Sequence, residues 1–209
     1  MNSNGVNYYW VAFRAFNARL RVGSYVGNGT TQSPTGFGFS PEYVMVASAG
    51  ANQAVQRSST MGTTFRFDDV AATANGITTL GADGFSVGNS AQANTNGTTY
   101  HYVAWNAVPE AMGTGSYTGT GVDNRAITVP TFAPQYVIVK SNTTGAGGGC
   151  DLPVHRPASL AGDSTLNFTN VANLTDVIQA LTGTGFQVGT NCRVNTNTAT
   201  YHWVAFRDP

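Results

Sequence analysis

The sequence predicts an all-β protein: two tandem β-sandwich units of jelly-roll-like topology, preceded by a strand equivalent to the closing strand of a repeat. One closing segment occurs three times within 209 residues. Between these copies, short apolar runs alternate with Gly, Asn and Ser turns roughly every 8–12 residues. The composition, rich in Gly, Thr and Asn, suits half-buried strands and the turns that join them.

The closing segment sets the expected domain boundaries. It reads Tyr-Tyr-Trp-Val-Ala-Phe-Arg over residues 8–14, Tyr-His-Tyr-Val-Ala-Trp over 100–105 and Tyr-His-Trp-Val-Ala-Phe-Arg over 201–207. Internal repeats of this kind indicate a tandem array. We expect a closing strand of a preceding or partner unit in residues 1–16, a first sandwich in 17–108 and a second in 109–209, each with its own core.

The two units match element by element along the chain. Each opens on Gly-Ser-Tyr, continues with a strand that starts near a proline, and ends on the closing segment. The proline suits a strand start, where its missing N–H is harmless. The difference in residue number between matched positions grows along the chain. It is 92 for Tyr25 and Tyr117, 93 for Pro41 and Pro134, 99 for Arg57 and Arg156, and 101 for Phe67 and Phe168. Because the added residues fall in loops, notably the Gly-rich run 144–149, the pattern predicts one duplicated fold.

One stretch has helical spacing. Leu174, Val177, Ile178 and Leu181 recur three and four residues apart within residues 170–181. The matching stretch of the first unit contains Gly76 and is a poorer helix. We therefore expect a short helical turn or a lead-in to a strand.

Charge and hydropathy exclude several partners. Ten basic and ten acidic residues are scattered without runs, so we expect neither nucleic acid nor an anionic membrane as a partner. No apolar stretch approaches the roughly 18 residues of a membrane span, and residues 1–4 lack the features of a signal peptide. A polar surface with a single lysine is typical of extracellular or virion proteins, which is the expected localisation.

These motifs carry a family resemblance. The order Gly-Ser-Tyr-x-Gly-x-Gly, then Gly-Phe-x-Pro-x-x-Val at 38–44, then Asp-Gly-Phe-x-Val-Gly at 83–88, then the closing segment resembles the concanavalin A-like jelly-roll repeats of phage tail fibres and related virion and bacterial secreted surface proteins. The second unit departs from it, since Thr131 precedes Phe132 and Gly183-Thr184 replaces the acidic turn. The resemblance implies the fold and an appendage role, without a shared ligand site.

Candidate catalytic and metal-binding residues fail a test that the repeats provide. His101 and His202 occupy a position that is Tyr9 in the first copy, so a general base is not required there. Asp68-Asp69 becomes Thr169-Asn170 in the second unit, against a calcium site. Cys150 as a nucleophile would depend on His155, and the first unit has neither. We expect no enzyme activity, no catalytic residue, no metal and no cofactor.

Two pairs of residues have candidate structural roles. Arg57 and Arg156 occupy matched positions before Ser-, Thr- and Gly-rich turns, where a guanidinium can pin a loop by bonding carbonyls or can hold a carboxylate or glycan. Cys150 and Cys192 both lie in the second unit. They could form a disulfide in an oxidising compartment or both be free.

Aromatic residues on one face of the closing strands are candidates for an interface or for stacking on glycans. They are Tyr8, Trp10, Tyr100, Tyr102, Tyr201 and Trp203. Since the opposite face is also apolar, the strand is either covered on both sides or presents its rings outward. We expect packing between units or subunits, with a core role and glycan stacking as alternatives.

The expected function is that of a non-enzymatic structural or adhesive component of an extracellular assembly, with a phage tail or capsid appendage as first choice. Its partners would be further copies of itself, or virion or filament proteins, and surface glycans. One alternative is a bacterial surface filament subunit joined by strand complementation, in which a strand fills the edge of another unit. Another is a carbohydrate-binding module.

Overall fold

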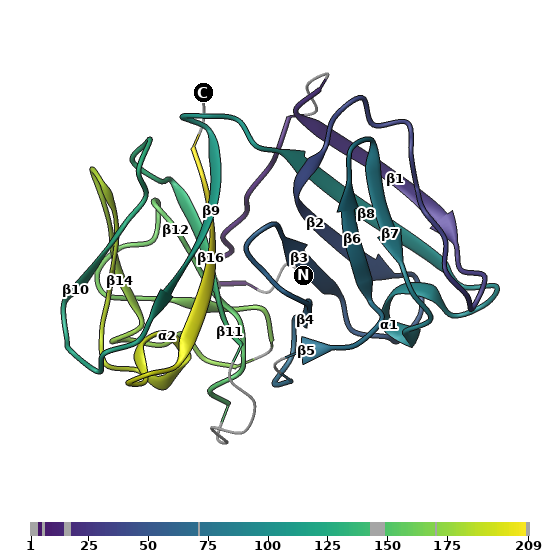
Figure 1. Ribbon diagram of the computed structural model, residues 1–209. Coiled ribbons are helices and arrows are strands. Elements are labelled where there is room, and N and C mark those ends of the chain that lie inside the picture. Colours follow the sequence, from purple (N-terminus) through teal and green to yellow (C-terminus); the bar gives the residue numbers. More distant parts are fainter. Residues whose placement is uncertain are drawn as a thin grey trace.

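The computed structural model describes residues 4–5, 7–14, 18–70, 72–142, 149–169 and 171–207, and it confirms the all-β prediction (Figure 1). The described residues form sixteen strands and two four-residue helices, α1 (Ala91–Asn94) and α2 (Cys192–Asn195). The strands belong to four antiparallel sheets. No sheet combines strands from residues 20–106 with strands from residues 112–206. We call these two parts the first half and the second half.

The first half is a sandwich of a large and a small sheet. The large sheet has the order β1-β8-β2-β3-β4-β5, and the small one is the hairpin β6-β7. Isolated bridges from Gln32 and Thr35 to β7 extend the hairpin. The strands are β1 (Leu20–Val26), β2 (Pro41–Ser48), β3 (Val55–Ser58), β4 (Thr64–Arg66), β5 (Ala72–Thr73), β6 (Ile77–Gly81), β7 (Gly84–Val87) and β8 (Thr99–Asn106).

The second half repeats this arrangement. Its large sheet has the order β13-β12-β11-β16-β9, and its small sheet the order β10-β15-β14. The strands are β9 (Met112–Thr118), β10 (Arg125–Thr128), β11 (Tyr136–Ser141), β12 (Val154–Pro157), β13 (Leu166–Asn167), β14 (Ile178–Thr182), β15 (Gly185–Val188) and β16 (Thr200–Phe206). The closing segments form β8 and β16, each between two neighbours of its large sheet.

The closing strands face two apolar layers because successive side chains of a strand point to opposite faces. In β8, Tyr100, Tyr102 and Ala104 point into the core of the first sandwich. In β16, Tyr201, Trp203 and Ala205 point into the core of the second. The core of each half therefore depends on its closing strand.

Matched hydrogen bonds fix the same loops in both halves. The Tyr100 hydroxyl donates to the Ala91 carbonyl at 2.7 Å, and the Tyr201 hydroxyl donates to the Cys192 carbonyl at 2.6 Å. The amide side chain of Asn195 is fully buried. Its Oδ1 accepts from the Thr120 amide at 2.9 Å, and its Nδ2 donates to the carbonyls of Val122 and Gly189 at 2.7 Å.

The same arrangement recurs in the first half, around the buried side chain of Asn94. Its Oδ1 accepts from the Asn28 amide at 2.9 Å, and its Nδ2 donates to the carbonyls of Thr30 and Gly88. Because a buried amide without partners would be costly, these bonds fix the loop geometry in both halves.

Glycine is needed where these loops touch. A Cβ atom on Gly27 would lie 2.1 Å from the Thr95 carbonyl oxygen, and one on Gly119 would lie 2.0 Å from that of Thr196. No real Cβ approaches backbone so closely. The Gly-x-Gly turns that the sequence repeats are therefore close contacts between two backbone segments.

The expected leading strand forms no ladder within the chain, and its pairing with a preceding or partner unit stays a prediction. Residues 7–14 are in no strand and are all exposed. In both large sheets the place of the closing strand is already filled, by β8 and by β16. The added copy of this sequence therefore has no vacant closing-strand position within the chain.

The stretch with helical spacing is a strand lead-in, and the expected helical turn is wrong. Leu174 forms an isolated bridge to Thr165, and Ile178 begins β14. Val177 and Ile178 are both fully buried. The apolar residues of this stretch are buried one after another along an extended chain. The spacing of apolar residues alone does not distinguish this arrangement from one face of a helix.

Candidate functional site: the cleft between the two halves

The two large sheets meet through their outer faces. A third apolar cluster lies between them, formed by Tyr43, Trp105, Met112, Ile138, Val204 and Phe206. The rings of Trp105 and Phe206 have centroids 5.4 Å apart, and those of Phe67 and Phe168 are 4.8 Å apart. These contacts join the first half to the second.

Lys140 adds a polar tie across the same junction. Its Nζ donates to the backbone carbonyls of Asp68 and Val70, both at 3.0 Å, and to that of Asp151. Burial lowers the pKa of the Lys140 amine to about 8, against the opposing effect of the Asp151, Asp68 and Asp69 carboxylates. The single lysine of the chain is therefore a structural residue of the second half that holds a loop of the first.

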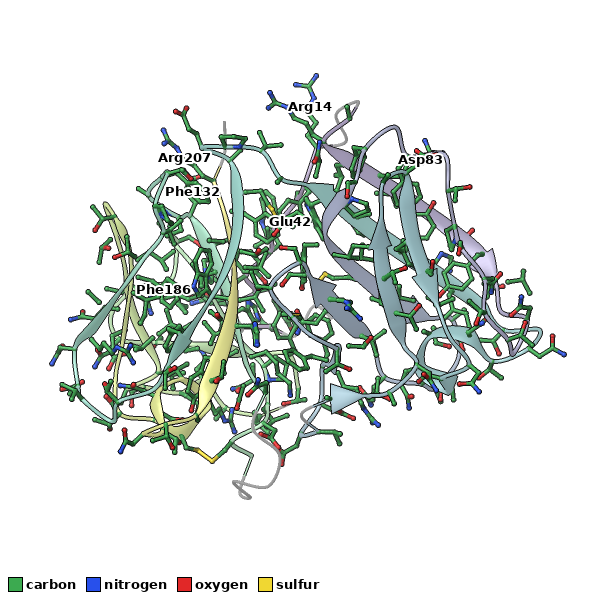
Figure 2. All side chains as sticks on the ribbon, viewed as in Figure 1. Arg14, Glu42, Asp83, Phe132, Phe186 and Arg207 are labelled. Atoms are coloured by element: carbon green, nitrogen blue, oxygen red, sulfur yellow. A yellow bond between two sulfur atoms is a disulfide. The ribbon has the colours of Figure 1, made fainter. Side chains whose placement is uncertain are left out.

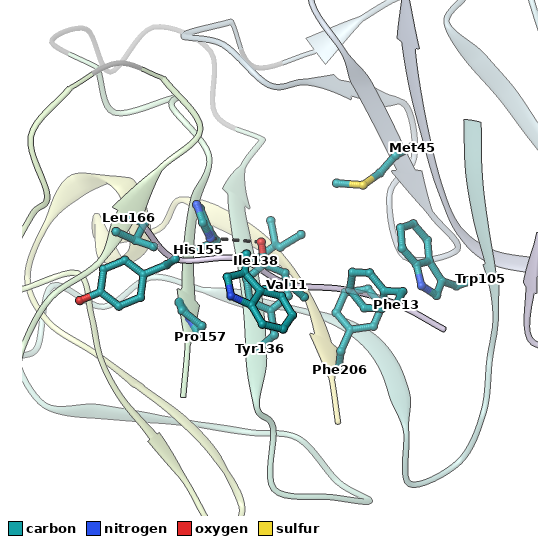
Figure 3. A pocket seen from close by; sticks show the side chains of 12 residues that line it. Val11, Phe13, Met45, Trp105, Tyr136, Ile138, His155, Pro157, Leu166 and Phe206 are labelled. Atoms are coloured by element: carbon teal, nitrogen blue, oxygen red, sulfur yellow. Dashed lines mark hydrogen bonds between the residues drawn. The ribbon is translucent and has the colours of Figure 1, made fainter. Parts of the chain in front are cut away.

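Residues 7–14, which we call the N-terminal segment, lie over this junction as an extended strap. The Phe13 ring packs against the rings of Trp105, at 5.2 Å, and Phe206, at 4.8 Å. Figure 3 shows Phe13 beside these two side chains, with Val11 on the same strap. Tyr8 remains 46% exposed and Trp10 81% exposed. The segment thus rests on the cleft without being buried in it.

The strap separates two hollows. The smaller, of about 220 Å³, is drawn in Figure 3; Met45, Ile138, His155 and Leu166 are among its lining residues. On its floor the Tyr136 hydroxyl and His155 Nδ1 are 3.1 Å apart. Burial lowers the pKa of His155 to about 4, so this imidazole is neutral at physiological pH.

The larger hollow, of about 770 Å³, lies where several strands begin or end, and we call it the arginine groove. It is lined by Trp10, Val11, Ala12, Phe13, Arg14, Arg19, Leu20, Trp105, Asn106, Val108, Ala111, Met112, Gln135, Tyr136, Pro157, Ala158, Ser159, Phe206 and Arg207. Three arginines and no acidic residue occur among these described residues. Figure 2 shows Arg14 and Arg207 at the same end of the molecule.

The predicted interface aromatics divide into two groups. Tyr8 and Trp10 are exposed on the N-terminal segment, and the other four are buried. Tyr100, Tyr102, Tyr201 and Trp203 are at most 7% exposed and lie inside the two sandwich cores, so their prediction as interface or glycan-stacking residues is wrong. Each large sheet is covered on its inner face by a small sheet, and these four side chains point to that side. Packing between the halves is instead carried by the opposite face of the same strands.

Both arginines of the matched pair donate to backbone carbonyls. Arg57 Nη1 donates to the Ile77 carbonyl at 2.9 Å. Arg156 donates to the carbonyls of Leu160, Gly162 and Ser164. Burial lowers the pKa of both guanidinium groups. Arg156 thus pins the loop that follows it, whereas Arg57 holds the start of β6.

Cys150 and Cys192 form a disulfide, with their Cα atoms 5.3 Å apart. The bond ties the end of the glycine-rich loop to the first residue of α2. The α2 loop also receives the Tyr201 hydroxyl and contains Asn195. The disulfide therefore adds a covalent tie to a region that has no cysteine in the first half.

The histidines lie in three different environments. His101 is exposed on the outer face of β8, while the matched His202 is 5% exposed at the junction between the halves. Burial lowers the pKa of His202, and its Nδ1 has no hydrogen-bond partner among the described residues. Across the part of the chain that the structure describes, His, Cys, Asp and Glu form no group of three or more that could hold a metal ion.

Sequence reasoning missed Lys140 and the groove arginines. The only lysine of the sequence directly follows a run of apolar residues in a strand, and this position was a signal that its side chain is buried. Arg14 and Arg207 end two copies of the closing segment, but nothing in the sequence indicates that both copies meet at one end of the molecule. Arg19 gave no signal, because it falls in the connection before β1.

No family model, curated protein or solved structure was found to match the chain. No helix among the described residues is long and apolar enough to cross a membrane. The fold and the cleft are thus the observations from which function is argued.

Proposed function

We propose that the protein is a non-enzymatic structural and adhesive component of an extracellular assembly, with a virion appendage such as a phage tail or capsid fibre as first choice. The observation that carries the proposal is the N-terminal segment. Residues 8–14 differ from residues 201–207 at one position only, Tyr9 against His202, yet they lie outside every sheet. The virion assignment rests on the resemblance of the repeats.

The segment has the properties of a strand that completes a sheet elsewhere. Trp10 is 81% exposed, whereas the matched Tyr102 and Trp203 are 7% and 4% exposed within their sheets. Burying such a ring stabilises an assembly by about 3 kcal/mol. Main-chain hydrogen bonds to an edge strand would add to this. The proposed mechanism is therefore strand addition to another copy.

An acceptor edge is present in the same molecule. β1 lies at the edge of the large sheet of the first half. Its outer face presents Val22 and Val26, which are 59% and 58% exposed. Exposed apolar edge strands are places where a second chain adds. Two copies could join through the N-terminal segment of one and β1 of the other.

The test measures self-association of the full chain by light scattering after size exclusion, with electron microscopy of the assemblies. Val11→Pro removes an N–H from the segment and should weaken association at least about tenfold, because proline cannot donate to a ladder. Val11→Thr is the matched control and should associate as the wild type does. Equal association of Val11→Pro, or unchanged folding and assembly after deletion of residues 1–16, would refute strand completion.

Strand completion applies equally to a bacterial surface filament, the second candidate. Electron micrographs of native material separate the two settings: particles with appendages favour a virion, and bare cellular filaments favour a surface fibre. A carbohydrate-binding role is favoured by a different observation, the arginine groove, and is developed below.

A further inference from the structure

We propose that the arginine groove binds an acidic oligosaccharide, a short chain of sugars that carry carboxylate groups. This inference deepens the adhesive part of the proposed function, by naming a ligand class. It concerns the chain whose N-terminal segment rests on the junction, because strand addition to another copy would take Trp10 and Arg14 out of the groove. The groove is formed within a single chain by the junction of the two halves and the strap.

Charge gives the first argument. Arg14, Arg19 and Arg207 are three of the ten cationic residues of the chain, all three are exposed, and they line one hollow. None of the described residues that line it is acidic. An arginine fork matches a carboxylate in geometry as well as in charge. The described lining of the groove thus gathers three cationic side chains on a chain whose formal net charge is zero.

Ring surface gives the second argument. Trp10 lines the groove and is 81% exposed, so the indole is open to a ligand. An aromatic ring combines a large apolar area with a polar tip, and it can pack against the C–H face of a sugar. The volume of about 770 Å³ lies within the range of roughly 300–1,000 Å³ that is usual for ligand pockets.

Polar groups and the course of the strands favour a sugar over an acidic peptide. The side chains of Asn106, Gln135 and Ser159 add amide and hydroxyl groups to the lining, which suit sugar hydroxyls. The groove is built from strand ends and connections: β8 and β16 end there, and β9 and β11 begin there. Of the edge strands β1 and β9, only the first residues, Leu20 and Met112, line the groove, so an extended peptide would find little of a ladder to join.

The experiment titrates the full chain with tetragalacturonate and follows binding by calorimetry and by indole fluorescence. We expect saturable binding that weakens as salt is added, because exposed charges are screened. The double variant Arg19→Gln/Arg207→Gln should bind at least about tenfold more weakly. Arg21→Gln is the control, two residues after Arg19 in β1, exposed but outside the groove, and it should bind within about twofold of the wild type.

Two further comparisons test geometry and stacking. Arg207→Lys keeps the charge and loses the planar fork, so it should also weaken binding. Trp10→Ala should weaken binding, whereas Tyr8→Ala, on the same segment but outside the groove, should not. Far-UV circular dichroism establishes that each variant is folded.

Four results would overturn the proposal: no binding of tetragalacturonate by the wild type, equal binding of neutral maltotetraose, equal binding of tetraglutamate, or equal weakening by Arg21→Gln. Light scattering on the same samples separates this proposal from the previous one. For the wild-type chain, self-association without sugar binding refutes the groove alone. For the wild-type chain, sugar binding without self-association refutes strand completion alone.

Discussion

The two halves are alike on the inner faces of their large sheets and different on the outer faces. Tyr100 and Tyr201 make the same hydrogen bonds to matched loops. On the outer face, Ala47 and His101 are register partners and both are exposed. The matched partners Lys140 and His202 are both buried.

This difference separates two kinds of information in the sequence. The inner positions repeat because each half must build its own core between two sheets. The outer positions have diverged because the two outer faces have different surroundings. Where the halves pack together, Lys140 and His202 of the second half are buried, whereas the matched residues of the first half are exposed to solvent. Substitutions at matched positions can test this separation.

The largest expected effect concerns the disulfide, which only the second half has. Cys150→Ser/Cys192→Ser opens a loop with a sequence separation of 42 residues and should cost about 4 kcal/mol of unfolding free energy. Hydrogen exchange should increase in residues 112–207 and change little in 20–106. Ala91→Ser, at the position that matches Cys192, is the control. Equal loss of protection in both halves would show that the halves unfold as one unit.

The glycine contacts should have equal effects in the two halves. Gly27→Ala and Gly119→Ala place a Cβ against a carbonyl oxygen and should each cost about 3 kcal/mol, measured by thermal unfolding. Gly183→Ala is the control, since nothing lies within 4 Å of its Cβ position. A large cost in one half only would contradict the equivalence of these loops.

Acid should destabilise the second half selectively. The folded pKa of His155 is about 4 and the ordinary value is 6.5, so the unfolded chain binds the extra proton first as the pH falls. Stability is full above pH 6.5 and is lost as the pH falls toward 4, by about 2 kcal/mol after allowance for partial exposure. The matched residue Gln56 does not titrate. His155→Gln should reduce this slope in denaturant titrations; an unchanged slope would contradict the assignment.

The smallest effect on stability concerns the sheet edges. Val22 and Val26 of β1 match Thr114 and Thr118 of β9. Val22→Thr/Val26→Thr should change the unfolding free energy by less than about 0.5 kcal/mol, because the side chains are exposed. It should nevertheless weaken self-association if β1 is the acceptor edge. The reverse change at the exposed position, Thr118→Val, controls for strand propensity; Thr114 is kept because its hydroxyl donates to the Glu42 carboxylate in the first half.

The duplicated fold was predictable because its signals are local and repeated. Alternation in the closing segments, prolines at strand starts and the shared offsets all survive in a single sequence. The face of each ring was harder to assign. Both faces of β16 are apolar, and periodicity cannot tell a face that meets the small sheet from a face that meets the other half.

The cleft could not be predicted for a related reason. Arg14 and Arg207 are 193 positions apart, and their proximity to one hollow depends on how the halves dock. That docking rests on non-repeated residues, such as Lys140 with the carbonyls of Asp68 and Val70. Residues 8–14 form no strand within the chain because both closing-strand positions are filled, by β8 and by β16, and their pairing with a partner unit stays a prediction.

Because Lys140 is buried, the chemical reactivity of its amine reports on opening of the junction between the halves. Acylating reagents attack neutral, accessible amines, and the only lysine side chain is fully covered at the junction of the halves. Modification of that side chain must therefore wait until the halves separate. The rate at which a lysine reagent labels residue 140 measures how often the junction opens.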